Sequence, residues 1–243
     1  MDLEIWQIMI LILVGACAAF IQRVSGFGMG IFAMLFLPYL FSDAVIAAAV
    51  VGAWSCFTCS CNSIKYRRHI KPRLILPMAG AALVTIPLAI LCSSMVPKQT
   101  MLILLGIVLI MLSLYFLLFS KKIHLKTSTG TGVLVGALGG TLSGLFSTGG
   151  PPAVLYLSGV VEEKDTYFAN IQFYFALTNL YAFIVRILNG IMTGTVLMYT
   201  LIGLAGALLG DGLGVLVFRK LDGNRIKQII YFGMIVSGIL MLV

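Results

Sequence analysis

Charged residues are scarce in this chain. Asp, Glu, Lys and Arg together make up 10% of its 243 residues, and 60% of the residues are hydrophobic. A soluble domain carries about 25% charged residues. No polar stretch is longer than roughly ten residues, which leaves no room for a soluble core beside a membrane anchor. The composition predicts an all-α polytopic membrane protein.

Residues that build catalytic or metal sites are also few. The two histidines, His69 and His124, fall in loops, and no pair of carboxylates lies inside an apolar segment. Cys56, Cys59 and Cys61 are close in sequence, but no histidine accompanies them at metal-ligand spacing. We interpret the five cysteines as packing residues, and we expect no cofactor, no metal ion and no catalytic residue.

Basic residues outnumber acidic ones by 16 to 8, yet they form no nucleic-acid patch. They gather in short loops between apolar segments, the pattern that the positive-inside rule predicts for cytoplasmic loops. The first apolar segment, residues 5–20, has no basic stretch before it and no clear cleavage site after it. We interpret it as a retained helix and not as a signal peptide.

The apolar segments divide the chain into two halves, residues 1–120 and 127–243. Each half has five segments, and the second of each is shorter than the ~20 residues that span a bilayer. The segments of the first half are 5–24, 31–41, 44–64, 74–92 and 101–119. Those of the second half are 131–147, 152–160, 167–188, 196–218 and 226–243. Each half is expected to be a broken or re-entrant helix pair followed by three transmembrane helices.

An odd number of segments per half places the second half upside down relative to the first. The loop charges agree, because loop 65–73 is strongly basic while its counterpart 189–194 carries no charge. The next loop reverses this, with only Lys98 in the first half and a basic run at 219–225 in the second. We therefore predict two inverted repeats in a bacterial inner (plasma) membrane, with both termini on the outer side.

The stretch 139–152 cannot be an ordinary transmembrane helix. It contains Gly149-Gly150-Pro151-Pro152, and a proline in a helix interior costs about 3 kcal/mol. Pro151 suits the first turn of a new helix, so we predict a helix to about Thr148, a break, and a restart at Pro151. Broken backbone at membrane depth must be buried in protein or line a wet cavity. The restarted helix would present free N–H groups and a positive dipole end to an anion.

A second break is predicted near the start of the chain, at Ser25-Gly26-Phe27-Gly28-Met29-Gly30. Broken helices at matching positions of inverted repeats indicate a transporter with its site near the midplane. The alternative is that the glycines only let helices pack closely, which is our interpretation of Gly132, Gly136, Gly203, Gly206 and Gly210.

These two motifs, with Tyr167-Phe168-Ala169-Asn170, resemble the TauE/SafE family of sulfite-exporter-like permeases over essentially the whole chain. The resemblance implies a membrane transporter for a small anion such as sulfite, a sulfonate, sulfoacetate or a thiosulfate-like species. Ser147 stands where the family often has glycine, which leaves the backbone conformation at this position open.

Three ionisable residues lie within or beside spanning segments, where they are costly and often functional. Arg23 could supply a fixed positive charge to an anion site, or its side chain could extend to the membrane surface. The sequence does not distinguish these two interpretations. For Arg186, near the end of its segment, we favour a side chain that reaches the outer surface. Asp211 could carry a coupled proton or pair with Lys220 or an amide, and we favour pairing.

The spacing of the asparagines along segment 167–188 also limits which of them can line the site. Asn170 and Asn179 are nine residues apart, about 2.5 helical turns, so they point to opposite sides. At most one of them lines the pocket, and we favour Asn170 because it belongs to the family-like run.

The prediction is a permease that binds a small anion, expected from the resemblance to be a sulfur oxyanion or organosulfonate, and works by alternating access. An anion channel, a membrane-embedded enzyme and a purely structural assembly partner remain as alternatives. The expected partners are the anion and the bilayer, without nucleic acid, and a homo-oligomer is compatible with the sequence. The residues expected to bind the anion are Gln22, Arg23, Ser25, Gly26, Phe27, Gly28, Ser143, Gly144, Ser147, Thr148, Gly149, Gly150, Pro151 and Asn170.

Overall fold

The protein was analysed as a computed structural model, which describes residues 4–119, 128–217, 232 and 235–242. Within these ranges the secondary structure is entirely helical, without a strand. The first half contains α1 (Ile5–Ser25), α2 (Met29–Ala33), α3 (Leu37–Phe41), α4 (Ala44–Lys65), the 3-10 helix η1 (Arg67–His69), α5 (Pro72–Met95) and α6 (Lys98–Phe119). The second half contains α7 (Thr129–Phe146), α8 (Gly150–Val160), α9 (Lys164–Leu188) and α10 (Gly194–Val217).

Both predicted helix breaks are confirmed. The first separates α1 from α2, and the second separates α7 from α8. The short segment 31–41 was expected to be one element and is instead two five-residue helices, α2 and α3. Pro38 in the first turn of α3 explains the division, because proline favours a helix start and has no N–H to continue a preceding turn.

Seven helices of the described chain are long and apolar enough to cross a membrane: α1, α4, α5, α6, α7, α9 and α10. Helix α8 has 11 residues, or about 16 Å at 1.5 Å per residue, and cannot cross a hydrocarbon core of about 30 Å. The protein is therefore an all-α, multi-pass membrane protein. Half of the predicted last segment, 226–243, falls outside the described residues, and the basic loops at 121–126 and 219–225 lie entirely outside them.

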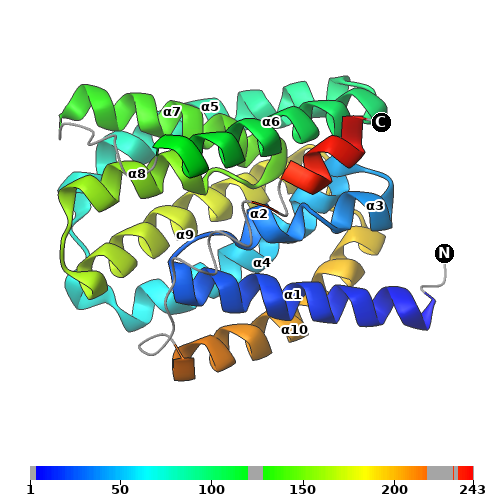
Figure 1. The fold of residues 1–243 in the computed structure, drawn as a ribbon, viewed down its shortest axis with the longest axis horizontal. Coiled ribbons are helices and arrows are strands. Elements are labelled where there is room, and N and C mark those ends of the chain that lie inside the picture. Colours follow the sequence, from blue (N-terminus) through cyan, green and yellow to red (C-terminus); the bar gives the residue numbers. More distant parts are fainter. Residues whose placement is uncertain (1–3, 120–127, 218–231, 233–234, 243) are drawn as a thin grey trace.

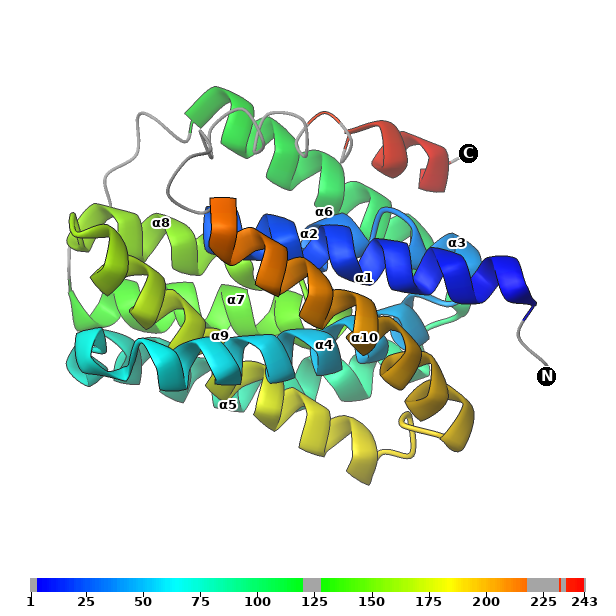
Figure 2. The same ribbon diagram turned by 90° about the horizontal axis from the view of Figure 1, so that it is seen from below.

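Helices α4 and α9 form the centre of the bundle. They pack against each other and are the most buried of the long helices. Figure 1 shows them between two outer pairs, α1 with α10 and α5 with α7, and Figure 2 gives the same arrangement from below.

The outer pairs approach closely through glycines, as predicted for Gly136 and Gly206. A Cβ atom at Gly206 of α10 would lie 2.0 Å from the Ile12 carbonyl oxygen of α1. A Cβ atom at Gly136 of α7 would lie 2.1 Å from the Met78 carbonyl oxygen of α5. Each helix that precedes a break is thus fixed along a helix from the other half of the chain.

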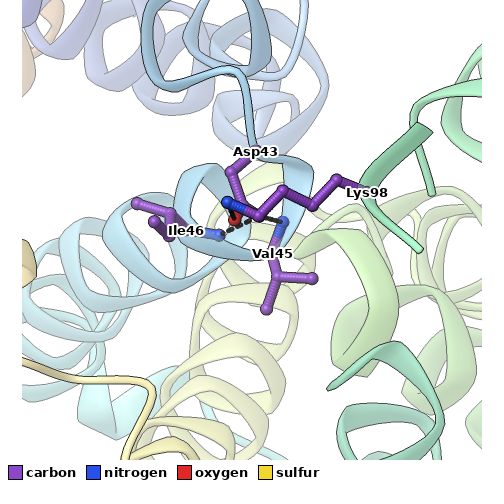
Figure 3. Close-up of polar contacts among 4 residues, drawn as sticks. All are labelled: Asp43, Val45, Ile46 and Lys98. Atoms are coloured by element: carbon purple, nitrogen blue, oxygen red, sulfur yellow. Dashed lines mark hydrogen bonds and ion pairs between the residues drawn. The ribbon is translucent and has the colours of Figure 1, made fainter. Parts of the chain in front are cut away.

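The start of α4 is held by a capping carboxylate. Asp43 Oδ1 accepts hydrogen bonds from the backbone N–H groups of Val45 and Ile46 at 2.9 and 3.2 Å (Figure 3). Its second oxygen lies 2.9 Å from Lys98 Nζ at the start of α6. Asp43 therefore satisfies two N–H groups that have no partner within the helix and joins α4 to α6.

We expect Asp43→Ala to lower the free energy of unfolding by about 1 kcal/mol, because the cap of α4 is lost. Lys98→Gln is the matched control, and it should cost less than about 1 kcal/mol because the Lys98 side chain is 69% exposed. Denaturant unfolding of the detergent-solubilised protein measures both. Equal losses in the two variants would contradict the capping role.

Candidate functional site

The second break is built around Ser147. Helix α7 ends at Phe146, and Ser147 takes a left-handed conformation with φ of +54°. This conformation costs a non-glycine residue roughly 1–2 kcal/mol, which is why glycine is common at such positions. The N–H groups of Ser147 and Thr148 bond back to the carbonyl oxygens of Ser143 and Leu142, at 2.9 and 3.3 Å. Serine at this position therefore has the backbone that a glycine would adopt.

Two side-chain bonds hold Ser147 in place. Its hydroxyl donates to the Ala48 carbonyl oxygen in α4 at 2.8 Å, and it accepts from Arg186 Nη1 at 3.1 Å. Glycine could make neither bond. The hydroxyl thus connects the break to α4 and α9 and compensates for the strained backbone.

Arg186 is buried, so the prediction that it reaches the outer surface is wrong. Only 1% of it is exposed, and its Nη2 donates to the carbonyl oxygens of Ser143 and Gly144 at 3.2 and 3.0 Å. These carbonyls belong to the last turn of α7, whose dipole end is negative and favours a cation. The carbonyls at the end of α7 attract the guanidinium inward, which the position of Arg186 in the sequence does not reveal. No described carboxylate forms an ion pair with Arg186.

The first break relies on glycine. Gly26 and Gly28 have φ of +84° and +108°, the conformations that glycine adopts at least cost. Gln172 of α9 donates from its Nε2 to the Gly26 carbonyl oxygen at 3.1 Å, and Gln22 Nε2 lies 2.8 Å from Cys59 Sγ of α4. Helices α4 and α9 therefore hold this break as they hold the other.

The two breaks lie against each other. A Cβ atom at Gly30 in α2 would be 2.0 Å from the Ser147 carbonyl oxygen. A Cβ atom at Gly150 would be 3.5 Å from Cβ of Phe27. Only glycine at position 30 lets the two interrupted segments meet at this distance.

A cavity lies where the breaks meet. The space open to the centre of a water molecule is about 20 Å³, which is room for about one water. It is lined by Gln22, Gly28, Gly30, Ile31, Ser55, Gly139, Ser143, Ser147, Thr148, Gly149, Gly150, Tyr174, Phe175, Thr178 and Asn179. Seven of the predicted site residues are in this wall: Gln22, Gly28, Ser143, Ser147, Thr148, Gly149 and Gly150.

The other predicted site residues are not part of this wall. They are Arg23, Ser25, Gly26, Phe27, Gly144, Pro151 and Asn170. Asn170 bonds the Lys71 N–H at 2.8 Å and the His69 carbonyl at 3.1 Å, so it fastens the basic loop to α9. Asn179, the alternative that we ranked second, lines the cavity.

The residues that α9 contributes to the wall were not among the predicted site residues. Tyr174, Phe175, Thr178 and Asn179 recur at the three- and four-residue spacing of one helix face, and this periodicity was a usable signal. Gly30 and Gly139 belong to the two predicted break motifs but were not named as site residues. Ile31 and Ser55 had no comparable signal, because their role depends on which helices meet.

Two polar atoms of the wall have no hydrogen-bond partner among the described residues. They are Thr148 Oγ1 and Asn179 Oδ1, and their residues are only 1% and 5% exposed. A buried polar group left unpaired costs about 1–3 kcal/mol. Such atoms in a cavity wall indicate that the cavity receives a polar ligand or water.

Arg23 and Asp211 form a separate polar group beside the cavity. Arg23 is buried, donates to Asn62 Oδ1, and lies over the rings of Tyr66 and Phe168 at 5.4 and 5.0 Å. Asn62 Nδ2 donates to Asp211 Oδ1 at 3.1 Å, so the favoured pairing of Asp211 with an amide is present. Lys220, the other suggested partner, lies outside the described residues. Arg23 is therefore enclosed by protein and is not part of the cavity wall.

Comparison with known proteins identifies the family. A family model described as sulfite exporter TauE/SafE matches residues 11–241. The chain belongs to the TauE/SafE family. As a TauE/SafE protein whose described residues include seven helices able to cross a membrane, it is a membrane transporter. Curated proteins and solved structures gave no match.

A substitution at Gly52 of α4 tests the contact between Arg186 and Ser147. A Cβ atom there would lie 2.4 Å from Arg186 Nη1 and 2.8 Å from Ser147 Oγ. We expect Gly52→Ala to displace the guanidinium and lower the free energy of unfolding by about 1–2 kcal/mol, as lost hydrogen bonds do.

Gly80→Ala in α5 is the matched control for Gly52→Ala. A Cβ atom at Gly80 would have no neighbour within 4 Å. Alanine there should stabilise the helix by up to about 1 kcal/mol. A Gly52→Ala protein as stable as Gly80→Ala in the same denaturant titration would show that the contact is unimportant.

Proposed function

We propose that this TauE/SafE protein carries a small anion, which binds in the cavity between the two breaks. The observation that carries the proposal is the buried hydroxyl of Thr148. It lies in the wall at the start of α8 and has no hydrogen-bond partner in the described chain. A hydroxyl donor beside the N–H group of Gly150 and the positive dipole end of α8 is suited to an oxyanion, although Pro151 and Pro152 contribute no N–H group.

Charge near the cavity supports an anion as the ligand. Helix α8 begins at Gly150 in the cavity wall, and its 11 residues supply a positive dipole end. Arg186 lies directly behind Ser147, and Arg23 follows Gln22 in the chain. No carboxylate is among the lining residues. In contrast to α8, α2 has five residues and contributes little dipole, so the two breaks are not equivalent.

The packing of the bundle supports two inverted repeats. Helix α1, before the first break, packs along α10 of the second half, and α7, before the second break, packs along α5 of the first. Helix α4 packs against its counterpart α9. A two-fold axis that exchanges the halves would produce this set of pairs. We retain the halves 1–120 and 127–243, and we place the protein in a bacterial inner membrane with both termini outward.

The size of the cavity favours a carrier over a channel. A conducting channel needs a continuous wet path, whereas this cavity has room for about one water. An oxyanion would enter only when the breaks move apart, as in alternating access. The sulfur chemistry of the substrate rests on the family description, because the cavity itself indicates only a small anion. Asp211, bonded to Asn62, is the candidate for coupling to protons.

Removal of the Thr148 hydroxyl tests the site directly. We expect Thr148→Val to weaken sulfite binding on the order of tenfold, because a hydrogen bond to a charged ligand is lost while the shape is kept. Thr141→Val is the matched control, since Thr141 is exposed on α7 and bonds its own helix. Sulfite uptake into proteoliposomes, with counterflow to separate carrier from channel, gives the measurement. Equal sulfite uptake by both variants and the unmodified protein would contradict the proposal that the anion binds at Thr148.

Replacement of Arg186 tests the charge behind the break. We expect Arg186→Met to abolish uptake, because the α7 carbonyls lose their donors and the cavity loses a nearby positive charge. Arg186→Lys keeps the positive charge but lacks the planar guanidinium with its several N–H donors, so this variant should retain partial uptake. Full uptake by folded Arg186→Met protein would show that this charge does not serve the anion.

A further inference from the structure

The amide of Asn179 has a fixed orientation. Its Nδ2 donates to the Phe175 carbonyl oxygen at 2.9 Å and to Ser55 Oγ at 3.3 Å. A carbonyl oxygen only accepts, so turning the amide over would set two acceptors against each other. Oδ1 is therefore an acceptor, and it has no partner among the described residues.

The cavity thus has two different walls. Thr148 Oγ1 and the start of α8 offer donors, which suit the oxygens of an anion. Asn179 Oδ1 on α9 offers an acceptor, which repels the lone pairs of an anion that has no hydrogen to donate. A ligand that satisfies both walls needs negative oxygens at one end and a donor hydrogen at the other.

We propose that the anion recognised by this site also carries an O–H donor, and that Asn179 Oδ1 accepts its hydrogen. The inference rests on the anion site proposed above and makes Asn179 a specificity-determining residue. The O–H has two chemical sources, the hydroxyl group of a hydroxylated organosulfonate or the acidic proton of hydrogensulfite. A site built to bond a hydroxyl discriminates against the analogue that lacks it, because its own polar atom is left unpaired.

The first arm of the test uses a matched pair of sulfonates at one pH. Hydroxymethanesulfonate and ethanesulfonate have the same shape and charge and differ by a hydroxyl in place of a methyl group. We expect the full-length protein in detergent to bind the hydroxylated anion at least about tenfold more tightly by calorimetry. In Asn179→Leu this ratio should fall to about one, and retained binding of ethanesulfonate shows that the variant is folded.

The second arm addresses the acidic proton, and it compares sulfite with methanesulfonate across neutral pH. Sulfite takes up a proton near neutral pH and methanesulfonate does not. If hydrogensulfite is the bound species, sulfite affinity falls about tenfold for each pH unit above that ionisation, while methanesulfonate affinity stays flat.

Methanesulfonate also reports any titration of the protein itself. The titratable and charged groups on the helices that enclose the cavity are Cys59 of α4, which contacts Ser55, Tyr174 and Arg186 of α9, Arg23 of α1 and Asp211 of α10. A pH effect from one of these groups would change both affinities together.

The outcomes separate this inference from the function on which it rests. Discrimination in either arm that Asn179→Leu removes supports the inference and identifies the source of the hydrogen. Binding of all four anions without a hydroxyl or pH preference overturns the inference and leaves the anion site standing, with water as the donor to Asn179. If none of the anions binds, both proposals fail.

Discussion

A backbone that leaves the helix inside a membrane must find hydrogen-bond partners within the protein, because lipid offers none. This constraint organises the whole bundle. Each of the two breaks is held by α4 and α9, the most buried of the long helices, through side chains such as Arg186, Gln172 and Asn62. The outer pairs α1–α10 and α5–α7 complete the enclosure. Two buried polar atoms without a partner in the described chain, Thr148 Oγ1 and Asn179 Oδ1, belong to residues that line the cavity, so the constraint that shapes the fold also shapes the proposed site.

The two breaks reach this result by different chemistry. Gly26 and Gly28 adopt left-handed conformations with little strain, and amide side chains provide their contacts. Ser147 adopts a left-handed conformation at a cost, which its bonds to Ala48 and Arg186 offset. At the second break a hydroxyl and a guanidinium bond each other, Ser147 with Arg186, and this break begins the longer helix, α8. The longer helix dipole at the cavity therefore comes from the second half of the chain.

Individual residues show where inference from sequence succeeds and where it stops. Pro151 and the glycines around it define a break locally, since the cost of proline and glycine in a helix depends on little else. The seven predicted residues that line the cavity are all in or next to such breaks. Asn179 and Arg186 were misjudged because the face of α9 that a residue occupies says nothing about which helix lies opposite. The burial of Arg186 depends on the carbonyls of α7, which are distant in the chain and close only in the fold.

The sequence by itself determined that the protein is a multi-pass helical membrane protein with two interrupted helices, because hydropathy, proline and glycine act over short range. Its motifs also identified the family. Only the tertiary structure decided that the breaks meet, that Arg186 turns inward, and that Asn179 and not Asn170 lines the cavity. These outcomes depend on which helices pack together and on which buried polar atoms find partners. Helix packing and the pairing of buried polar atoms are determined by many contacts between distant segments together, and no single segment specifies them.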